Sequence, residues 1–276
     1  KSFTKIKKIL KRDKINIFNN YEMFNKFFKK KIDYTMSAIS GLDGLKSTLK
    51  IIRLSKKIAI ANKESIICAW NLIEKELKKY QTIFIPVDSE HFSIWSLLGG
   101  KKNNLIDEVV ITASGGPFLN LPLNKFRYIK KNSALKHPNW SMGAKISIDS
   151  STLMNKVFEV IEAQRIFKID LGKFTVYTHP KSYVHAIVKF KNGLTKVLLH
   201  DTDMKIPIFN SIYNNQINTI KSKKLNLETL NNLDFRKVDS KKFPLIQLIK
   251  SLSNKVSLFE TILVSANDEL VSLFLN

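Results

Sequence analysis

The chain of 276 residues is 44% hydrophobic and 25% charged, a composition that excludes an intrinsically disordered protein. It contains no apolar run of about 18 residues, and its basic start lacks the apolar core and cleavage site of a secretory signal, so neither a membrane span nor a signal peptide is predicted. The formal net charge of +23 comes from lysines scattered among Asn and Ile, without the Arg cluster or aromatic platform of a nucleic-acid surface. We interpret this charge as a drift of the whole composition toward Lys, Asn and Ile.

A single cysteine, Cys68, excludes an intramolecular disulfide and a cysteine-based zinc site and is compatible with a reducing compartment. The length is sufficient for one large or two modest domains with real cores. The sequence begins at Lys1 rather than Met, which suggests a fragment or a processed product.

The first third of the chain alternates helical and strand patterns. Residues 1–36 alternate basic and aromatic side chains and predict helices and one short strand. Beyond the glycines of SAISGLDGLKST, the expected elements are a helix to about Arg53, a strand at 57–61, a helix at 65–79 and a strand at 82–87. This alternation predicts a parallel sheet, which binds ligands at the carboxyl ends of its strands.

Acidic side chains follow the second of these strands. Asp88 and Glu90 are two residues apart, so on an extended backbone both carboxylates point to the same side. Like charges placed together repel each other, and a shared cation explains them; oxygen ligands without cysteine favour Mg²⁺ or Mn²⁺. The alternative is a pair that caps a helix at 89–97.

A Ser-Gly-Gly turn follows the next expected strand, at 109–112. Its closely spaced backbone amides suit a phosphate or another oxyanion. Gly-Gly is also common in turns without a binding role, so this alternative stays open.

The stretch at 137–163 is the densest in polar and aromatic residues. The loop HPNWSMG predicts a lid, because Trp140 and Met142 exposed on a loop cost solvation unless they close over something; a Trp that plugs the core is the alternative. A short β-like run at 145–148 is followed by Ser150, Ser151 and Thr152, which predict the cap of a helix beginning near Thr152.

This helix carries an apolar stripe and a polar face. The polar face holds an amide and a lysine in its first turns, where the helix terminus favours an anion, and Glu159 one turn further on, which suits a cation. An ordinary solvated face is the alternative. The polar residues are Asn155, Lys156, Glu159 and Glu162.

The remainder of the chain predicts more strands and a helical end. Strands at 174–178, 183–189 and 195–199 suggest an antiparallel portion, and His179 and His185 near them are interpreted as structural histidines. Residues 210–240 are predicted to form a linker, and residues 245–276 are predicted to form two helical segments.

Taken together, these segments resemble the 1-deoxy-D-xylulose-5-phosphate reductoisomerase family, NADPH-dependent enzymes of the non-mevalonate isoprenoid pathway. The matching blocks occur in family order with compatible spacing. They are ANKES (61–65), PVDSEH (86–91), TASGGPF (112–118), HPNWSMG (137–143), KISIDSSTLMNK with Glu159 (145–159), HPKSYVHAIV (179–188) and DMKIPI (203–208).

The resemblance implies a function and a set of site residues. The expected metal ligands are Asp88, Glu90 and Glu159, which with Lys63 form the expected catalytic group. The expected substrate-binding residues are Lys63, Ser89, Glu90, Ser114, His137, Trp140, Ser150, Asn155, Lys156 and Glu159. The expected NADPH contacts are Asn62, Glu64, Met142 and Gly143, and Trp140 and Met142 belong to the expected flap.

The resemblance also implies an α/β fold with three parts. They are the remainder of a Rossmann-like NADPH domain (1–87), a catalytic α/β domain (88–209) and, after a linker (210–240), part of a C-terminal helical domain (241–276). The implied partners are a phosphosugar substrate, Mg²⁺ or Mn²⁺ and a second copy in a cytoplasmic homodimer, with no nucleic acid and no membrane.

The sequence departs from the family pattern in three places. No glycine precedes Gly41, so the family's glycine-rich NADPH loop is not found in this sequence, and the C-terminal domain is curtailed. Val157 and Phe158 stand where the family usually has Gly and Leu and are expected to crowd the helix near Glu159. A truncated member is predicted; the alternatives are a non-reducing remnant that binds metal and sugar phosphate, and a basic nucleic-acid-binding protein.

Overall fold

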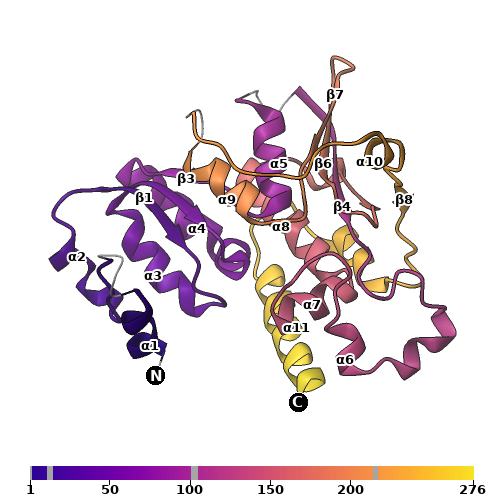
Figure 1. The fold of residues 1–276 in the computed structure, drawn as a ribbon, viewed down its shortest axis with the longest axis horizontal. Helices are drawn as coiled ribbons and strands as arrows, with labels where there is room; N and C mark the ends of the chain where they lie inside the picture. Colours follow the sequence, from indigo (N-terminus) through magenta and orange to yellow (C-terminus); the bar gives the residue numbers. More distant parts are fainter. Residues whose placement is uncertain (1, 11–14, 101–104, 214–216) are drawn as a thin grey trace.

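The computed structural model describes residues 2–10, 15–100, 105–213 and 217–276. It has an α/β fold with two sheets, which lie apart in Figure 1 and are joined by helices between them. The first sheet has strand order β1-β2-β3, and the second has the order β7-β6-β4-β5-β8. The predicted fold class is therefore confirmed.

The first sheet is built from the N-terminal third of the chain. Its strands are all parallel, as predicted, with Tyr34 paired to Lys57 and Lys57 to Ile83. Buried isoleucines from the strands and helices, among them Ile52, Ile58 and Ile73, form its core. Residues 1 and 11–14, part of the predicted N-terminal helices, lie outside the described residues. The elements are α1 (Ser2–Ile9), η2 (Tyr21–Met23), α2 (Phe24–Phe27), β1 (Ile32–Ser37), α3 (Asp43–Ile52), β2 (Ser55–Ile60), α4 (Lys63–Tyr80) and β3 (Ile83–Ile85).

The second sheet is mixed and centres on β4, which pairs parallel with β5 and antiparallel with β6. The predicted antiparallel portion is the β6–β7 pair. Buried apolar residues of the sheet pack against α5 and α8. The elements are α5 (Ser89–Leu98), β4 (Ile106–Ala113), β5 (Phe174–Thr178), β6 (Val184–Phe190), β7 (Thr195–Leu199) and β8 (Arg236–Lys237).

The segment between β4 and β5 is helical, and here two predictions are wrong. It contains η4 (Leu123–Tyr128), α6 (Lys131–Ala134), α7 (Ala144–Ser151) and α8 (Met154–Phe167). The β-like run at 145–148 lies in α7, which is stabilised by an i,i+4 pair between Lys145 and Asp149 (2.9 Å). Ser150 and Ser151 therefore do not cap the next helix; Leu153, with φ 61°, occupies that position, and only Thr152 of the predicted cap accepts from a first-turn amide, that of Met154 (3.3 Å).

The helix α8 accommodates both bulky residues expected to crowd it. Val157 and Phe158 are 0% and 1% exposed and pack in a core cluster with Ile67 of α4 and Val264. The α-helix continues without interruption from Met154 to Phe167, so neither side chain breaks it.

The C-terminal part departs from the predicted linker at 210–240. Within that range β8 pairs antiparallel with β5 and a short helix forms, because backbone pairing with a distant strand leaves little trace in local composition. Residues 214–216 lie outside the described part. The two predicted helical segments at 245–276 are present, although the first is a 3₁₀ helix. The elements are η5 (Leu171–Lys173), α9 (Lys205–Ile212), α10 (Leu227–Asn231), η6 (Pro244–Ser251) and α11 (Phe259–Leu275). Among the described helices, none has the length and apolar character needed to span a bilayer.

The buried helix α8 joins the two halves of the molecule. Its residue Ile166 packs against the core of the first sheet and also against the core of the second. In Figure 1, α8 lies behind α5 and near α7 and α11. The C-terminal end of α8 thus packs against the cores of both sheets.

Candidate functional site

A cavity of about 270 Å³ opens where the carboxyl ends of β2, β3 and β4 meet the amino ends of α4, α5 and α8. This is the edge at which open α/β sheets bind ligands. Most residues expected from the sequence line it. They are Asn62, Lys63, Asp88, Ser89, Glu90, Ser114, His137, Trp140, Met142, Ser150, Asn155, Lys156 and Glu159.

Two residues expected to contact NADPH do not line this cavity. Glu64 instead pairs with Lys145 of α7 (Oε1 to Nζ 3.2 Å), and Gly143 lies exposed at the start of α7. Asn62 does line the cavity, but its side chain is already engaged: it caps α4 by accepting from Ser65 N (2.7 Å) and donates to the carbonyls of Ile39 and Gly41.

Three carboxylates form the acidic wall of the cavity. One oxygen from each of Asp88, Glu90 and Glu159 lies within 4.8 Å of the other two. Asp88 also caps α5 by accepting from the amide of Glu90 (3.1 Å), so the capping alternative and the cluster hold at once. Ser89 donates to Glu90 (2.6 Å) and orients that carboxylate.

The Lys156 ammonium lies between two of these carboxylates. Its Nζ is 2.5 Å from Glu90 and 2.7 Å from Glu159. Burial opposes ionisation of Glu90, but the charges of Lys156 and His185 outweigh it and lower the pKa of Glu90. Burial, with the neighbouring Glu90, raises the pKa of Glu159.

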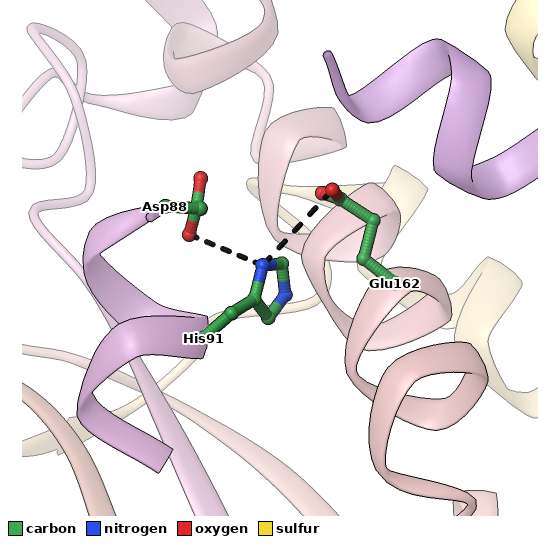
Figure 2. A group of neighbouring side chains, drawn as sticks. All are labelled: Asp88, His91 and Glu162. Carbon is green, nitrogen blue, oxygen red and sulfur yellow. Dashed lines mark ion pairs between the residues drawn. The ribbon is translucent and has the colours of Figure 1, made fainter. Parts of the chain in front are cut away.

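A second group shares Asp88 with the first and includes His91 and Glu162, which the sequence did not single out as site residues (Figure 2). The Lys63 ammonium is 3.3 Å from Glu162 and 3.9 Å from both Asp88 and Glu159. Burial would lower the pKa of Lys63, but these carboxylates, Glu162 first, raise it above its usual value, so the ammonium stays protonated near neutral pH.

The imidazole of His91 lies between Asp88 and Glu162 in the same view. Its Nδ1 is 3.4 Å from Asp88 and 4.0 Å from Glu162, while Nε2 is hydrogen bonded to the backbone carbonyl of Glu159 (2.8 Å). His91 thus ties α5 to α8 directly behind the carboxylates. The available signals were its place in PVDSEH and the three-residue spacing from Glu159 to Glu162, which puts both glutamates on one face of α8.

The opposite wall of the cavity is formed by hydroxyl and amide groups. The turn after β4 packs against the α7–α8 junction so closely that a Cβ on Gly116 would lie 3.0 Å from Ser150 O. This contact brings Ser114 and Ser150 to the same wall. The buried Oδ1 of Asn155, also in the wall, has no hydrogen-bond partner among the described residues, which leaves an acceptor for a ligand hydroxyl.

The loop at 137–143 covers this wall and is folded around His137. The Nδ1 atom of His137 accepts from the amides of Asn139 (3.2 Å) and Trp140 (3.0 Å), so its Nε2 carries the proton and donates to Ser114 Oγ (2.9 Å). Burial, with the charge of Lys156, lowers the pKa of His137 to about 4. The ring is therefore neutral at physiological pH, as these bonds require.

The same loop is anchored to the far side of the cavity. The side-chain amide of Asn139 donates to Pro180 O (2.6 Å) and Ser182 Oγ (2.9 Å). Trp140 is only partly buried, lies edge-on to the ring of His185 at 6.0 Å and lines the cavity, so it does not plug the core.

The two histidines interpreted as structural differ. His179 is held by backbone groups, with Nδ1 bonded to Asp234 O (3.0 Å) and Nε2 accepting from Tyr183 N (3.1 Å), which suits a structural role. His185 lines the cavity, and its buried Nε2 has no partner within the described part of the chain. For His185 the structural interpretation stays a prediction, since its ring lines the cavity and also stacks on the ring of His200 at 3.9 Å.

The acidic wall fits a divalent hard cation. All its donors are carboxylate oxygens, which Mg²⁺ and Mn²⁺ prefer, and they come from two different elements that meet only in the fold. The single ammonium of Lys156 already pairs with two of these carboxylates, so the wall accommodates positive charge.

Family comparisons agree with this geometry along most of the chain. A model described as 1-deoxy-D-xylulose 5-phosphate reductoisomerase matches residues 1–70. Models described as the C-terminal domains of the same enzyme match residues 84–167 and 199–276.

Individual relatives and structures point the same way. The 1-deoxy-D-xylulose 5-phosphate reductoisomerase of Pelagibacter ubique (strain HTCC1062) is 62% identical over 100% of this chain, which spans 71% of that relative. The Persephonella marina (strain DSM 14350 / EX-H1) enzyme is 44% identical over 88% of this chain, and the match spans 64% of its own length. The solved reductoisomerase from Zymomonas mobilis in complex with NADPH superposes with a TM-score of 0.84 at 32% identity, covering 99% of this chain and 71% of that one. A reductoisomerase solved with NADPH, fosmidomycin and magnesium gives a TM-score of 0.84 at 31% identity, covering 99% of this chain and 70% of that one.

Proposed function

The chain belongs to the 1-deoxy-D-xylulose 5-phosphate reductoisomerase family, and we propose that it catalyses the NADPH-dependent, metal-dependent conversion of 1-deoxy-D-xylulose 5-phosphate to 2-C-methyl-D-erythritol 4-phosphate. The observation that carries this proposal is the meeting, in one cavity, of an acidic wall and a wall of hydroxyl and amide groups. The first suits a divalent cation and the second suits a phosphosugar.

The acidic wall would hold the metal through Asp88, Glu90 and Glu159. When bound there, Mg²⁺ or Mn²⁺ supplies Lewis-acid chemistry that polarises the substrate's ketone and stabilises developing negative charge. Ser89 fixes the orientation of Glu90, and Asp88 is fixed as the cap of α5, so two of the three ligands are already oriented by the protein.

The opposite wall would bind the phosphate and hydroxyl groups of the substrate. Ser114 receives the His137 proton in a hydrogen bond, so its own hydroxyl proton is free to point to a phosphate oxygen. Ser150 adds a hydroxyl, and Asn155 and Lys156 add an amide and an ammonium group that are bonded to Glu159 in this structure. The loop with Trp140 and Met142 would close over the sugar and exclude water from the intermediate.

Lys63 would orient the substrate's hydroxyl groups. Because its pKa is raised, it is a hydrogen-bond donor and a fixed positive charge near neutral pH, and it is not a general base. Its ammonium lies beside the metal ligands, so it can contact the oxygens that the metal polarises.

Hydride would come from NADPH, which Met142 and Asn62 would contact from the lining of the cavity. Asn62 contributes through the loop that it fixes, since its amide is bonded to the carbonyls of Ile39 and Gly41. Glu64 and Gly143 would contact the cofactor outside this cavity, at the start of α4 and of α7.

The proposal extends to domains and assembly. We assign an NADPH-binding part to residues 1–87, a catalytic part to 88–209, a connecting segment to 210–240 and a helical part to 241–276. We also assign a cytoplasmic homodimer. The edge strand β7 supports the dimer, since Leu194 (53% exposed) and Val197 (42% exposed) leave apolar surface near an open sheet edge. Light scattering of the purified chain should give twice the mass of 31.7 kDa.

The test is substrate-dependent NADPH oxidation by the purified chain with Mg²⁺, compared with Glu159→Gln. We expect oxidation in the wild type and its loss in the variant, because one metal ligand is removed. Glu260→Gln is the matched control: Glu260 is also buried and ion-paired, with Arg165 at 3.0 Å, but lies outside the cavity.

A different outcome would favour the non-reducing alternative. Absence of oxidation, together with metal-dependent retention of the substrate that Glu159→Gln weakens, would indicate a protein that binds metal and sugar phosphate without reducing anything. The engagement of Asn62 and Glu64 in protein contacts is the observation that keeps this second candidate.

A further inference from the structure

We propose that Glu162 is a positioning residue: it holds the Lys63 ammonium and thereby keeps Asp88 and Glu159 available to a divalent cation. This inference rests on the proposed function, because it assumes that these carboxylates bind the metal. Glu162 lies one helical turn after Glu159 on α8, and its side chain is 2% exposed.

The distances show which carboxylate Lys63 favours. Its Nζ is 3.3 Å from Glu162 and donates a hydrogen bond to it, whereas its distances to Asp88 and Glu159 are both 3.9 Å. Without the negative charge of Glu162, the nearest charged partners of the ammonium would be those two ligands. Lys63 would then compete with the metal for them.

The charges of the whole group support the same role. Four carboxylates, from Asp88, Glu90, Glu159 and Glu162, face two ammonium groups, from Lys63 and Lys156. The excess of two negative charges is what a divalent cation balances in a buried site. Within this balance Glu162 neutralises the nearest ammonium, that of Lys63, so without Glu162 that ammonium would be balanced by Asp88 and Glu159 instead.

His91 completes the arrangement in Figure 2. Its Nε2 is bonded to the backbone carbonyl of Glu159 (2.8 Å), and its Nδ1 faces Asp88 at 3.4 Å and Glu162 at 4.0 Å. The ring therefore lies between Asp88 and Glu162 and links α5 to the backbone of α8 through Nε2. Outer groups of this kind orient metal ligands, and their loss typically lowers metal affinity roughly 10- to 100-fold.

The experiment is a titration of the full 276-residue chain with Mn²⁺, followed by electron paramagnetic resonance, in the wild type, Glu162→Gln and Glu260→Gln. We expect Glu162→Gln to weaken Mn²⁺ binding roughly 10- to 100-fold. Glu260→Gln, equally buried at 2% exposed and paired with Arg165, should lower the melting temperature but leave Mn²⁺ affinity within about twofold.

Two further measurements separate positioning from a structural role. In a Lys63→Met background, Glu162→Gln should no longer weaken Mn²⁺ binding, because the competing ammonium is gone. In the wild-type background, the activity of Glu162→Gln at low Mg²⁺ should be lost and then restored by excess Mg²⁺, a rescue that misfolded protein would not show.

The outcomes are distinct. Unchanged Mn²⁺ affinity in Glu162→Gln, or the same weakening with and without Lys63, would overturn the inference while leaving the proposed function intact. If the wild-type chain itself fails to bind Mn²⁺, the proposed function is overturned, and the inference with it.

Discussion

Lys156 and Lys63 differ in what they do to the metal ligands. Lys63 has a carboxylate partner of its own in Glu162, but Lys156 has its close ion pairs with Glu90 and Glu159. The ammonium of Lys156 therefore satisfies two of the proposed ligands directly. A cation that binds these ligands would release Lys156 toward the phosphate of a substrate.

Lys156→Gln should accordingly affect metal and substrate in opposite directions. Without substrate, the variant should bind Mn²⁺ about tenfold more tightly, a gain of ~1.4 kcal/mol, because a competing charge is removed. Its KM for the phosphosugar should rise. Paramagnetic resonance titrations and steady-state kinetics measure the two effects.

Lys145→Gln is the control for that prediction. Lys145 also pairs with buried carboxylate groups, Asp149 at 2.9 Å and Glu64 at 3.2 Å, but it does not line the cavity. Its Mn²⁺ affinity should match the wild type. Weaker Mn²⁺ binding in Lys156→Gln would contradict the competition argument.

His137 makes the lid sensitive to pH. Its folded pKa of about 4 lies below its ordinary value of 6.5, so between these values the unfolded chain binds a proton that the folded chain does not. The stabilisation is therefore complete above about pH 6.5 and is lost as the pH falls through that window.

His137→Asn should remove this part of the pH dependence. Between about pH 7.5 and about pH 5, the wild type should lose on the order of 1 kcal/mol more unfolding free energy than the variant, a figure reduced for the solvent exposure of the ring. Urea unfolding at the two pH values measures the difference. Equal losses in the two proteins would show that the amides of Asn139 and Trp140 do not depend on the neutral ring.

At the scale of elements, the packing of the first turn of α3 against the N-terminal cap of α4 depends on Gly44. A Cβ there would overlap the carbonyl of Ile39 and lie 2.5 Å from the Asn62 side-chain nitrogen. The clash falls on the contact that fixes the cap of α4, whose first turn carries Lys63.

Gly44→Ala should destabilise the protein by about 2 kcal/mol or more, since the neighbouring backbone cannot easily move away. Gly41→Ala is the comparison: Gly41 has φ 69° but open space around it, so only the backbone strain of about 1 kcal/mol applies. Urea unfolding of both variants gives the order, and a greater loss for Gly41→Ala would refute this account.

The same scale shows where sequence patterns succeed and fail. Strands such as 174–178 and 195–199 were predicted with their observed bounds, because apolar alternation between turn residues is local information. The prediction of a strand at 145–148 was wrong, because a pattern of four residues fits a strand or a helix equally well. The helix boundary at Leu153 requires a positive φ that leucine rarely adopts, so tertiary packing imposes it; Leu153 is 1% exposed.

Site residues could be predicted where a short stretch of sequence contains the whole motif. The segments around Asp88, Ser114 and Glu159 follow strands or begin helices, and the structure brings them to one cavity. Glu162 and His91 were not singled out, since their significance lies in contacts between α4, α5 and α8 that no local pattern encodes. For the same reason the sequence did not reveal that β4 pairs with β5 and β6 and starts a second sheet.

For the molecule as a whole, the proposed boundary at residue 87 separates two sheets without separating two independent cores. Trp70 belongs to the core of the first sheet, and Trp95 packs against the core of the second. Both cores include Ile166 of α8, and the cavity takes side chains from both halves. The two halves should therefore unfold as one cooperative unit.

Two single-tryptophan variants test this cooperativity. Trp95→Phe with Trp140→Phe leaves Trp70 as the reporter, and Trp70→Phe with Trp140→Phe leaves Trp95. Circular dichroism gives each variant's own unfolding transition in urea. The fluorescence transition of the same variant should coincide with it, because α8 cannot leave one core without exposing the other.

Ile166→Ala should lower the urea midpoints reported by Trp70 and by Trp95 together, since the removed side chain contacts both cores. A fluorescence transition that precedes the loss of helical signal in one variant only would show that one sheet unfolds by itself, and that α8 belongs to the other.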